Sequence, residues 1–247
     1  MTGQVLNPTL RGYVHDMAAP YGLAVHDTLI DEGKGHSYGE MCRPLLAELV
    51  HDDDPADLLV LATAIPDVRY GRSTATYLSW HCPGAPLAFT VCDQGLLAVF
   101  TALHLIAAYQ SRRAVLLAAE QPTVYHEVPV PTPMPSQAAA VGMVLTQEGP
   151  HRLTPIRRHT KLTPRQARET LAQEISGLGE PLVLAGAGLA ELTENHPVDG
   201  NIVVCQEKQP LTGIWLELTH RLQDLRNPLL LAEYDPTQGH LFTTTLS

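Results

Sequence analysis

The chain contains two copies of one arrangement: a buried strand, an apolar helix and a second buried strand. In the first copy, residues 87–92 and 114–120 form short apolar runs, and residues 95–110 between them have the length and apolarity of a buried helix. Continuous apolar runs are typical of strands that are covered on both faces, as in parallel sheets. The sequence therefore predicts a β-α-β unit whose helix lies in the centre of the molecule.

The second copy lies in the C-terminal part of the chain. Its elements are expected at residues 202–205, 211–222 and 229–233. When the copies are laid over each other, Val91 falls on Val204 and Glu120 on Glu233, at one constant offset of 113 residues without a gap. A constant spacing of this kind indicates an internal duplication.

One further strand precedes each copy, at residues 57–62 and 182–185. A helix over residues 164–177 leads into the second of these strands, because the sequence offers a capping box and a proline at its start. We therefore predict two similar α/β halves, residues 1–150 and 151–247, that pack as one compact unit.

Composition and charge narrow the classes of function. The 247 residues are 45% hydrophobic, enough for a large core, and the apolar runs are too short to span a bilayer. A formal charge of -10 argues against general nucleic-acid binding, since the protein would repel phosphates. The four cysteines and the histidines show neither a disulfide framework nor a metal-ligand spacing. We expect a cytoplasmic protein with reduced thiols and no metal.

One region is basic in this acidic chain. It comprises Arg152, Arg157, Arg158, Lys161, Arg165 and Arg168. Two interpretations stay open at this point. The patch is either a solvated helix face with its neighbouring loop or a surface that receives an acidic partner.

Four segments of the first half resemble a known family. Residues 57–67 read DLLVLATAIPD and precede Ser73-Thr74-Ala75, residues 88–91 read AFTV, 116–120 read LLAAE and 137–145 read QAAAVGMVL. In this order they resemble the ketoacyl synthase III group of the thiolase superfamily, over most of residues 40–145 and more weakly over 165–247. The resemblance implies a thiolase-like fold, with two duplicated halves, central buried helices and α-β-α-β-α layers.

The resemblance also implies a Cys/His/Asn triad, which this chain lacks. Asp93 stands at the position of the nucleophilic cysteine, Ala185 at that of the histidine, and Lys208 near that of the asparagine. The glycine-rich oxyanion segment is replaced by residues 233–236, EYDP. Ser73 and Thr74, which lie in the family-like segment, are candidates for binding the substrate or its carrier, and so, because of their charge, are Arg152, Arg157, Arg158 and Lys161.

Two readings of Asp93 and Cys92 remain open. A helix N-terminus stabilises negative charge, so Asp93 either caps the central helix or takes part in a changed reaction. As a nucleophile it would form a labile mixed anhydride, and it would repel a malonyl group. Cys92 is either a buried strand residue, as its apparent counterpart Cys205 suggests, or a nucleophile displaced by one residue.

Lys208 offers a further possibility in the second half. If the ends of both central helices meet, Lys208 and Asp93 form a buried ion pair that is either structural or a source of acid and base groups. The histidines, such as His81, His104 and His220, are expected to be ordinary polar residues.

These observations support three readings of function. The first is a triad-less partner subunit of a condensing or acyltransferase enzyme of secondary metabolism, which predicts a heterodimer with a ketoacyl synthase III homologue; a homodimer remains the other possible assembly of the protein. The second is an acyltransferase-type enzyme with altered chemistry on acyl thioesters: transfer to oxygen or nitrogen, cyclisation or hydrolysis. The third is an interaction protein without a ligand. In the first two, acyl-CoA or a phosphopantetheinyl acyl carrier protein is the expected ligand, with no permanently bound cofactor.

Overall fold

The computed structural model describes residues 5–128, 133–179, 181–195, 198–206, 208–225 and 227–247. Its first half contains α1 (Pro8–Ala18), α2 (Asp27–Asp31), α3 (Tyr38–Leu49), β1 (Leu58–Ala62), α4 (Thr74–Trp80), β2 (Leu87–Val91), α5 (Ala98–Tyr109), β3 (Arg113–Glu120) and β4 (Ala139–Thr146). The second half contains β5 (Arg157–His159), α6 (Pro164–Gly177), β6 (Leu182–Ala185), α7 (Ala187–Asn195), β7 (Asn201–Val204), α8 (Gly213–Arg221), β8 (Leu229–Asp235) and β9 (His240–Leu246). Short 3-10 turns, Gly95–Leu97 and Leu222–Asp224, precede α5 and follow α8.

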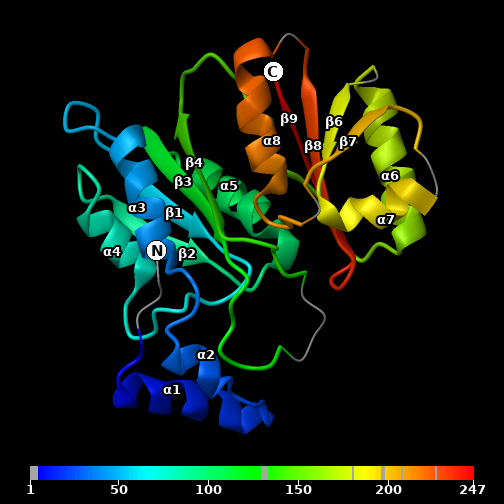
Figure 1. The fold of residues 1–247 in the computed structure, drawn as a ribbon. Helices are drawn as coiled ribbons and strands as arrows, with labels where there is room; N and C mark the ends of the chain where they lie inside the picture. The colour runs from blue at the N-terminus through cyan, green and yellow to red at the C-terminus, as the bar shows by residue number, and fades with distance from the viewer. Residues whose placement is uncertain (1–4, 129–132, 180, 196–197, 207, 226) are drawn as a thin grey trace.

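The two sheets share one topology, which confirms the predicted duplication. The order is β2-β1-β3-β4 in the first sheet and β7-β6-β8-β9-β5 in the second. The strands β2, β1 and β3 are parallel, as are β7, β6 and β8, and β4 and β9 run antiparallel to β3 and β8. Figure 1 shows the layers from left to right: α3 and α4, the first sheet, α5 and α8, the second sheet, and then α6 and α7.

The helices α5 and α8 join the two halves into one core. Their apolar faces pack with the inner faces of both sheets in a single cluster that reaches from Leu58 to Leu246. Phe100 of α5 meets Trp215 of α8 edge to face, with ring centroids 5.3 Å apart. Because α5 has hardly a polar residue, it is stable only between two apolar layers. The predicted central helix is confirmed, while the division at residue 150 stays a prediction.

The equivalence between the halves departs slightly from a constant offset. Val91 and Cys205 occupy the same place in the shared core, as do Phe100 and Trp215. These pairs are separated by one and two residues more than the predicted spacing. The loop between β7 and α8 is therefore longer than its counterpart, and residues in this loop cannot be matched by a fixed shift.

The outer helices close the molecule around this core. Helix α3 packs on the first sheet through Cys42 and Leu46, and α6 packs on the second through Leu171 and Ile175. The start of α6 is the predicted capping box, in which the side chains of Thr163 and Gln166 and their backbone amides bond reciprocally. None of the described helices is both long and apolar enough to cross a bilayer.

The N-terminal helices α1 and α2 form a small lobe below the layers (Figure 1). Val14 and Ile30 pack there with Val68 and Tyr125, which come from the loops after β1 and β3. The Tyr125 hydroxyl donates to the carbonyl of Lys34 at 2.7 Å. The lobe therefore rests on loops at the carboxyl edge of the first sheet.

Candidate functional site

The carboxyl ends of the parallel strands lie where α5 and α8 begin. In α/β sheets, ligands bind outside this edge, because loops and helix N-termini converge there. The predicted site residues Asp93 and Lys208 lie on the loops that connect β2 with α5 and β7 with α8.

Asp93 does not cap the central helix. The helical turn before α5 has Gln94 as its N-cap, without a side-chain hydrogen bond, and within the described part of the chain the Asp93 carboxylate accepts only from the Cys92 thiol, at 3.6 Å. The Asp93 backbone has φ of 58°, a left-handed conformation that aspartate tolerates better than most residues. The capping interpretation is wrong, and the residue instead turns the chain between β2 and α5.

Cys92 is exposed, whereas Cys205 is buried. The strand ends at Val91, so the thiol of Cys92 lies beyond the core, and the prediction that Cys92 packs inside a strand is wrong. Partial burial, and then the neighbouring Asp93, raise the pKa of the Cys92 thiol. A raised pKa leaves less thiolate at neutral pH, which is the opposite of what nucleophilic catalysis needs.

Lys208 is also exposed, and the described residues include no ion pair between Lys208 and Asp93. The predicted buried pair is therefore absent from this structure. The backbone of Lys208 accepts from the Ser136 amide at 2.8 Å. The next residue, Gln209, is buried instead and donates to the Gln137 carbonyl at 3.3 Å. Both bonds fasten the segment before β4 to the start of α8.

Ala185 is fully buried at the end of β6, and Glu233 fills the space beyond it. A side-chain carbon at Gly186 would collide with the Glu233 carboxylate, and one at Gly188 would collide with the Tyr234 carbonyl. Glu233 accepts from the amides of Gly188 at 3.0 Å and Tyr234 at 2.9 Å. Burial raises the pKa of Glu233 to about 8. The region of the expected histidine is thus packed around a buried carboxyl group.

Two more carboxylates reach across to the central helices of the opposite half. Glu120, at the end of β3, accepts from the amides of Leu211 and Thr212, each at 2.9 Å, and from the Thr212 hydroxyl. Burial raises the pKa of Glu120. Asp235, at the end of β8, lies against Gly95, where an added side-chain carbon would collide with its carboxylate. Each central helix therefore begins beside an acid from the other half.

The sequence did not identify these three acids as a group. Glu120 and Glu233 entered only as residues of repeated strands, and Asp235 as part of a replaced segment. Their common signal is an acid at the carboxyl end of an apolar strand. Among the described residues, no cluster of three or more potential ligands could hold a metal ion.

The predicted carrier-binding residues divide into two groups. Arg152, Arg158 and Lys161 are exposed beside β5, whereas Arg157 forms an ion pair with Glu174 at 2.7 Å. Ser73 caps α4 by accepting from the Thr76 amide, and the Thr74 hydroxyl donates to Asp67 at 2.6 Å. Ser73 and Thr74 thus have structural partners, and whether any of these residues binds a carrier stays a prediction.

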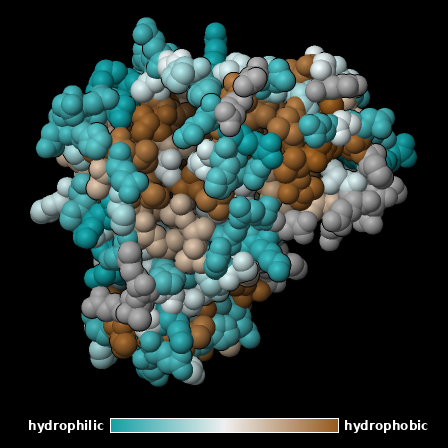
Figure 2. Space-filling model, turned by 45° about the horizontal axis from the view of Figure 1, so that its top comes forward, coloured by the Kyte–Doolittle hydropathy of each residue, from teal (hydrophilic) through white to brown (hydrophobic). Residues whose placement is uncertain are grey.

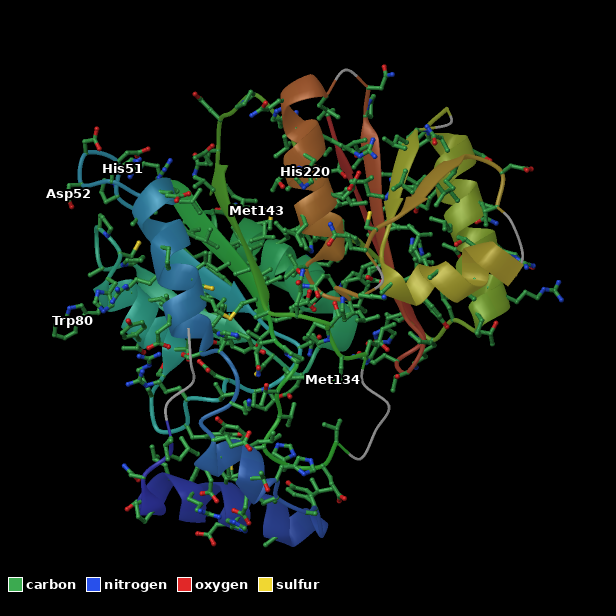
Figure 3. All side chains as sticks on the ribbon, in the orientation of Figure 1. His51, Asp52, Trp80, Met134, Met143 and His220 are labelled. Atoms are coloured by element: carbon green, nitrogen blue, oxygen red, sulfur yellow. The ribbon has the colours of Figure 1, made fainter. Side chains whose placement is uncertain are left out.

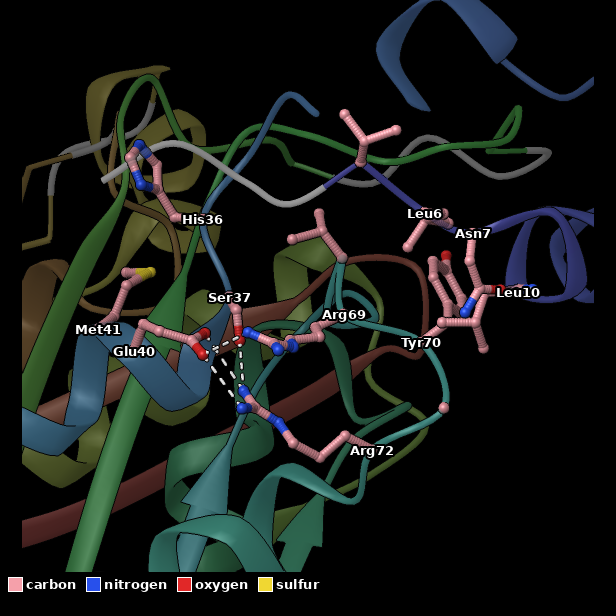
Figure 4. Close-up of a pocket in the computed structure, with 13 residues that line it drawn as sticks. Leu6, Asn7, Leu10, His36, Ser37, Glu40, Met41, Arg69, Tyr70 and Arg72 are labelled. Atoms are coloured by element: carbon pink, nitrogen blue, oxygen red, sulfur yellow. Dashed lines mark hydrogen bonds and ion pairs between the residues drawn. The ribbon is translucent and has the colours of Figure 1, made fainter. Parts of the chain in front are cut away.

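A pocket of about 410 Å³ opens elsewhere, between α1, α3 and the loop after β1 (Figure 4). Arg72 is held there by Glu40 and by the Ser37 hydroxyl, and its guanidinium lies 3.7 Å from the centre of the Tyr77 ring. Arg69 also pairs with Glu40, at 2.8 Å. The pocket does not include Asp93, Ala185 or Lys208.

Solved structures with the same arrangement identify the fold. AbyA1, a tetronic acid condensing enzyme, matches with a TM-score of 0.66 at 15% identity over 88% of this chain and 85% of its own. The acyltransferase ChlB3 matches with 0.64 at 15% over 86% and 84%. The 3-oxoacyl-[acyl-carrier-protein] synthase III of Aquifex aeolicus matches with 0.54 at 13% over 77% of each chain.

The protein has the thiolase fold of the ketoacyl synthase III type. The predicted fold class is thereby confirmed. No protein-family model matches the sequence, and no curated protein sequence matches it. At such low identity the likeness establishes the fold alone, so function has to be argued from the residues of this chain.

Proposed function

We propose that this thiolase-fold chain is a triad-less partner subunit of a ketoacyl synthase III-like condensing or acyltransferase enzyme of secondary metabolism. One observation carries the proposal: the starts of both central helices, and the loop after β6, are occupied by the carboxylates of Asp235, Glu120 and Glu233. A thiolate or an oxyanion at these places would meet the oxygen atoms of an acid side chain instead of free backbone amides.

The replacement is consistent with loss of thioester chemistry. Condensation needs a thiolate beside a helix N-terminus and an imidazole near it. Asp93 and Ala185 provide neither group. Substituting a cysteine for Asp93 alone would leave Asp235 beside the start of α5. A histidine in place of Gly186 or Gly188 would collide with residues 233–234.

An apolar surface around β2 is the part of the chain that we expect to meet the partner. Strand β2 is an edge strand, and Leu87 on it is 57% exposed. Trp80, at the end of α4, is 83% exposed and points away from the molecule in Figure 3. Tyr109, at the end of α5, is 52% exposed and packs on Phe89, with centroids 5.5 Å apart. Clustered exposed aromatic residues are typical of protein interfaces.

The ligand that we propose for the complex is an acyl thioester carried by coenzyme A or by an acyl carrier protein. Arg152, Arg158 and Lys161 are exposed cations on an otherwise acidic chain, and such a patch attracts phosphates or acidic helices. We also infer a cytoplasmic location, because all four cysteines are unpaired.

The proposal is tested by co-expression with each ketoacyl synthase III homologue encoded in the same genome. Affinity purification and native mass spectrometry are expected to recover a mixed dimer with one homologue. Trp80→Ala should reduce its yield, while Tyr21→Ala, at a residue 78% exposed in the N-terminal lobe, should not. An exclusive homodimer in the presence of every homologue would contradict the proposal.

The exposure of Cys92 favours one alternative, an enzyme with altered chemistry on acyl thioesters. Intact-mass spectrometry after incubation with acyl carrier protein thioesters distinguishes the two. We expect no adduct and no turnover from the isolated chain. An adduct that Cys92→Ala abolishes would support the alternative and refute the partner-subunit proposal.

A further inference from the structure

The first sheet has one strand fewer than the second in the part of the chain that the structure describes. In the second sheet, β5 pairs antiparallel with β9 and completes the edge, with Arg157 opposite Thr243 and His159 opposite Leu241. In the first sheet, β4 holds the position of β9, and no described strand pairs with its outer side. The duplication therefore leaves one strand position open.

The backbone groups that face this position can be assigned from the register. The Arg113 carbonyl accepts from the amide of Asp57, so the backbone groups of Arg113 face β1. Successive residues of a strand face its two neighbours alternately, so Ala114 and every second residue after it face β4. Ala114 lies opposite Leu145, so residues 139, 141, 143 and 145 of β4 bond to β3. Ala140, Gly142 and Val144 point their amides and carbonyls outward.

Strand β4 carries none of the features that usually protect an open edge. Its eight residues, AAVGMVLT, include no charge and no proline. Apolar side chains gather in the region of β4 on the face drawn in Figure 2, and Met143 is labelled on this strand in Figure 3. An unprotected apolar edge of this length is a template for another strand.

Helix α3 determines what can occupy the position. In the second half, Glu174 of α6 reaches over β5 and contacts both Arg157 and His159. In the first half, Leu45 and Leu49 of α3 lie over Gly142 of β4 and are half-buried. The part of α3 that covers β4 is therefore apolar, whereas the residue of α6 that covers β5 is acidic.

This helix also argues against a second copy of the chain. Two copies paired antiparallel through β4 would place both α3 helices on the same face, over strands only about 4.8 Å apart. A helix is about 10 Å across, so the two helices would overlap. The position therefore does not admit an antiparallel second copy.

We propose that the outer edge of β4 binds one extended segment of a partner polypeptide, antiparallel to β4, with apolar side chains directed at Leu45 and Leu49. The segment completes the first sheet as β5 completes the second. Its backbone bonds to Ala140, Gly142 and Val144. The surface lies on the opposite edge of the sheet from β2, so it is independent of the partner-subunit interface.

The test uses a fluorescein-labelled peptide of alternating threonine and valine as a probe. We expect saturable binding by fluorescence anisotropy and, in ¹⁵N spectra, slower amide exchange at Ala140, Gly142 and Val144. A peptide with lysine in place of valine should bind at least about 10-fold more weakly, since its side chains meet the leucines of α3. A peptide with a central proline should not bind.

Variants of the full chain locate the site. Val144→Pro removes an outward amide and leaves the bonds to β3, so it should weaken binding at least about 10-fold. The matched control is Thr90→Pro, which removes an outward amide from β2 and should leave peptide affinity unchanged. Thermal unfolding checks that each variant is folded, and Ala140→Pro replaces Val144→Pro if that variant is not.

Three results would overturn the proposal. The first is that the valine peptide shows no saturable binding up to about 1 mM. The second is that the lysine peptide binds as tightly as the valine peptide. The third is that the peptide slows amide exchange on β2 or β7 instead of β4. If Thr90→Pro no longer forms the mixed dimer but still binds the peptide, the β4 edge and the partner-subunit interface on β2 are different surfaces. The two proposals therefore fail independently.

Discussion

Glu233 makes the free energy of unfolding depend on pH in a way that can be measured directly. Burial raises its pKa from the ordinary value of 4.5 to about 8. The folded protein therefore holds a proton that the unfolded chain has lost between these two values. Stability from this group is complete below about pH 4.5 and is lost as the pH rises toward 8.

The perturbation is Glu233→Gln, which keeps the shape and the acceptor for the amides of Gly188 and Tyr234 but does not titrate. One proton contributes about 1.4 kcal/mol per pH unit. The unfolding free energy of the variant relative to wild type should therefore rise by about 3 kcal/mol from pH 5 to pH 7. Above pH 8 the difference should become constant.

Urea unfolding of both proteins at half-unit steps from pH 5 to pH 9 measures this difference. Subtracting the two curves removes the titration of all other groups that the substitution does not touch. Glu148→Gln, at an exposed position, is the matched control and should give a flat difference. A flat difference for Glu233→Gln, or one that falls with pH, would refute the reasoning.

Three further substitutions test the packing that positions the site. Trp215→Ala should lower the unfolding free energy by about 3–5 kcal/mol in urea unfolding, because the side chain is 1% exposed between the sheets; a loss under 1 kcal/mol would contradict the shared core. Gly188→Ala should destabilise by at least about 2 kcal/mol through its collision with the Tyr234 carbonyl, whereas Gly177→Ala, with open space around it, should not, as thermal unfolding will show. Thr163→Ala should cost about 1 kcal/mol by removing the capping box, and no measurable loss would show that the cap is redundant.

Most of the fold was predictable because its signals are local. The helix over residues 164–177 follows from a capping box and a proline, and the structure has it with the same bounds. The central helix between two apolar strands follows from its apolar composition, because an apolar helix of this length needs packing on more than one side. The strand order then repeats between the halves because the same elements recur in the same order.

The errors lie where a single residue decides between strand and turn. Residues 87–92 read as one strand, but the chain turns at Asp93 in a left-handed conformation and leaves Cys92 exposed. The open edge of β4 in the described part of the chain was equally unpredictable, because no local sequence pattern shows which strands pair. Both outcomes depend on long-range packing, which a window of sequence does not contain.

The candidate site was the least predictable part, since its acids look like ordinary strand ends. The sequence drew attention only to Ala185 in this segment, yet it is the lack of a side chain at Gly186 and Gly188 that admits Glu233 and the Tyr234 carbonyl. Gly186 and Gly188 pack directly against Glu233 and the Tyr234 carbonyl. Larger side chains at the two glycines would therefore fit only if residues 233–234 also changed. Glu120 bonds across to the start of α8, and Asp235 lies against Gly95 of the first half. We therefore infer that Glu120 helps to hold the two halves of the scaffold in register, whereas Glu233 fixes the loop after β6 within the second half.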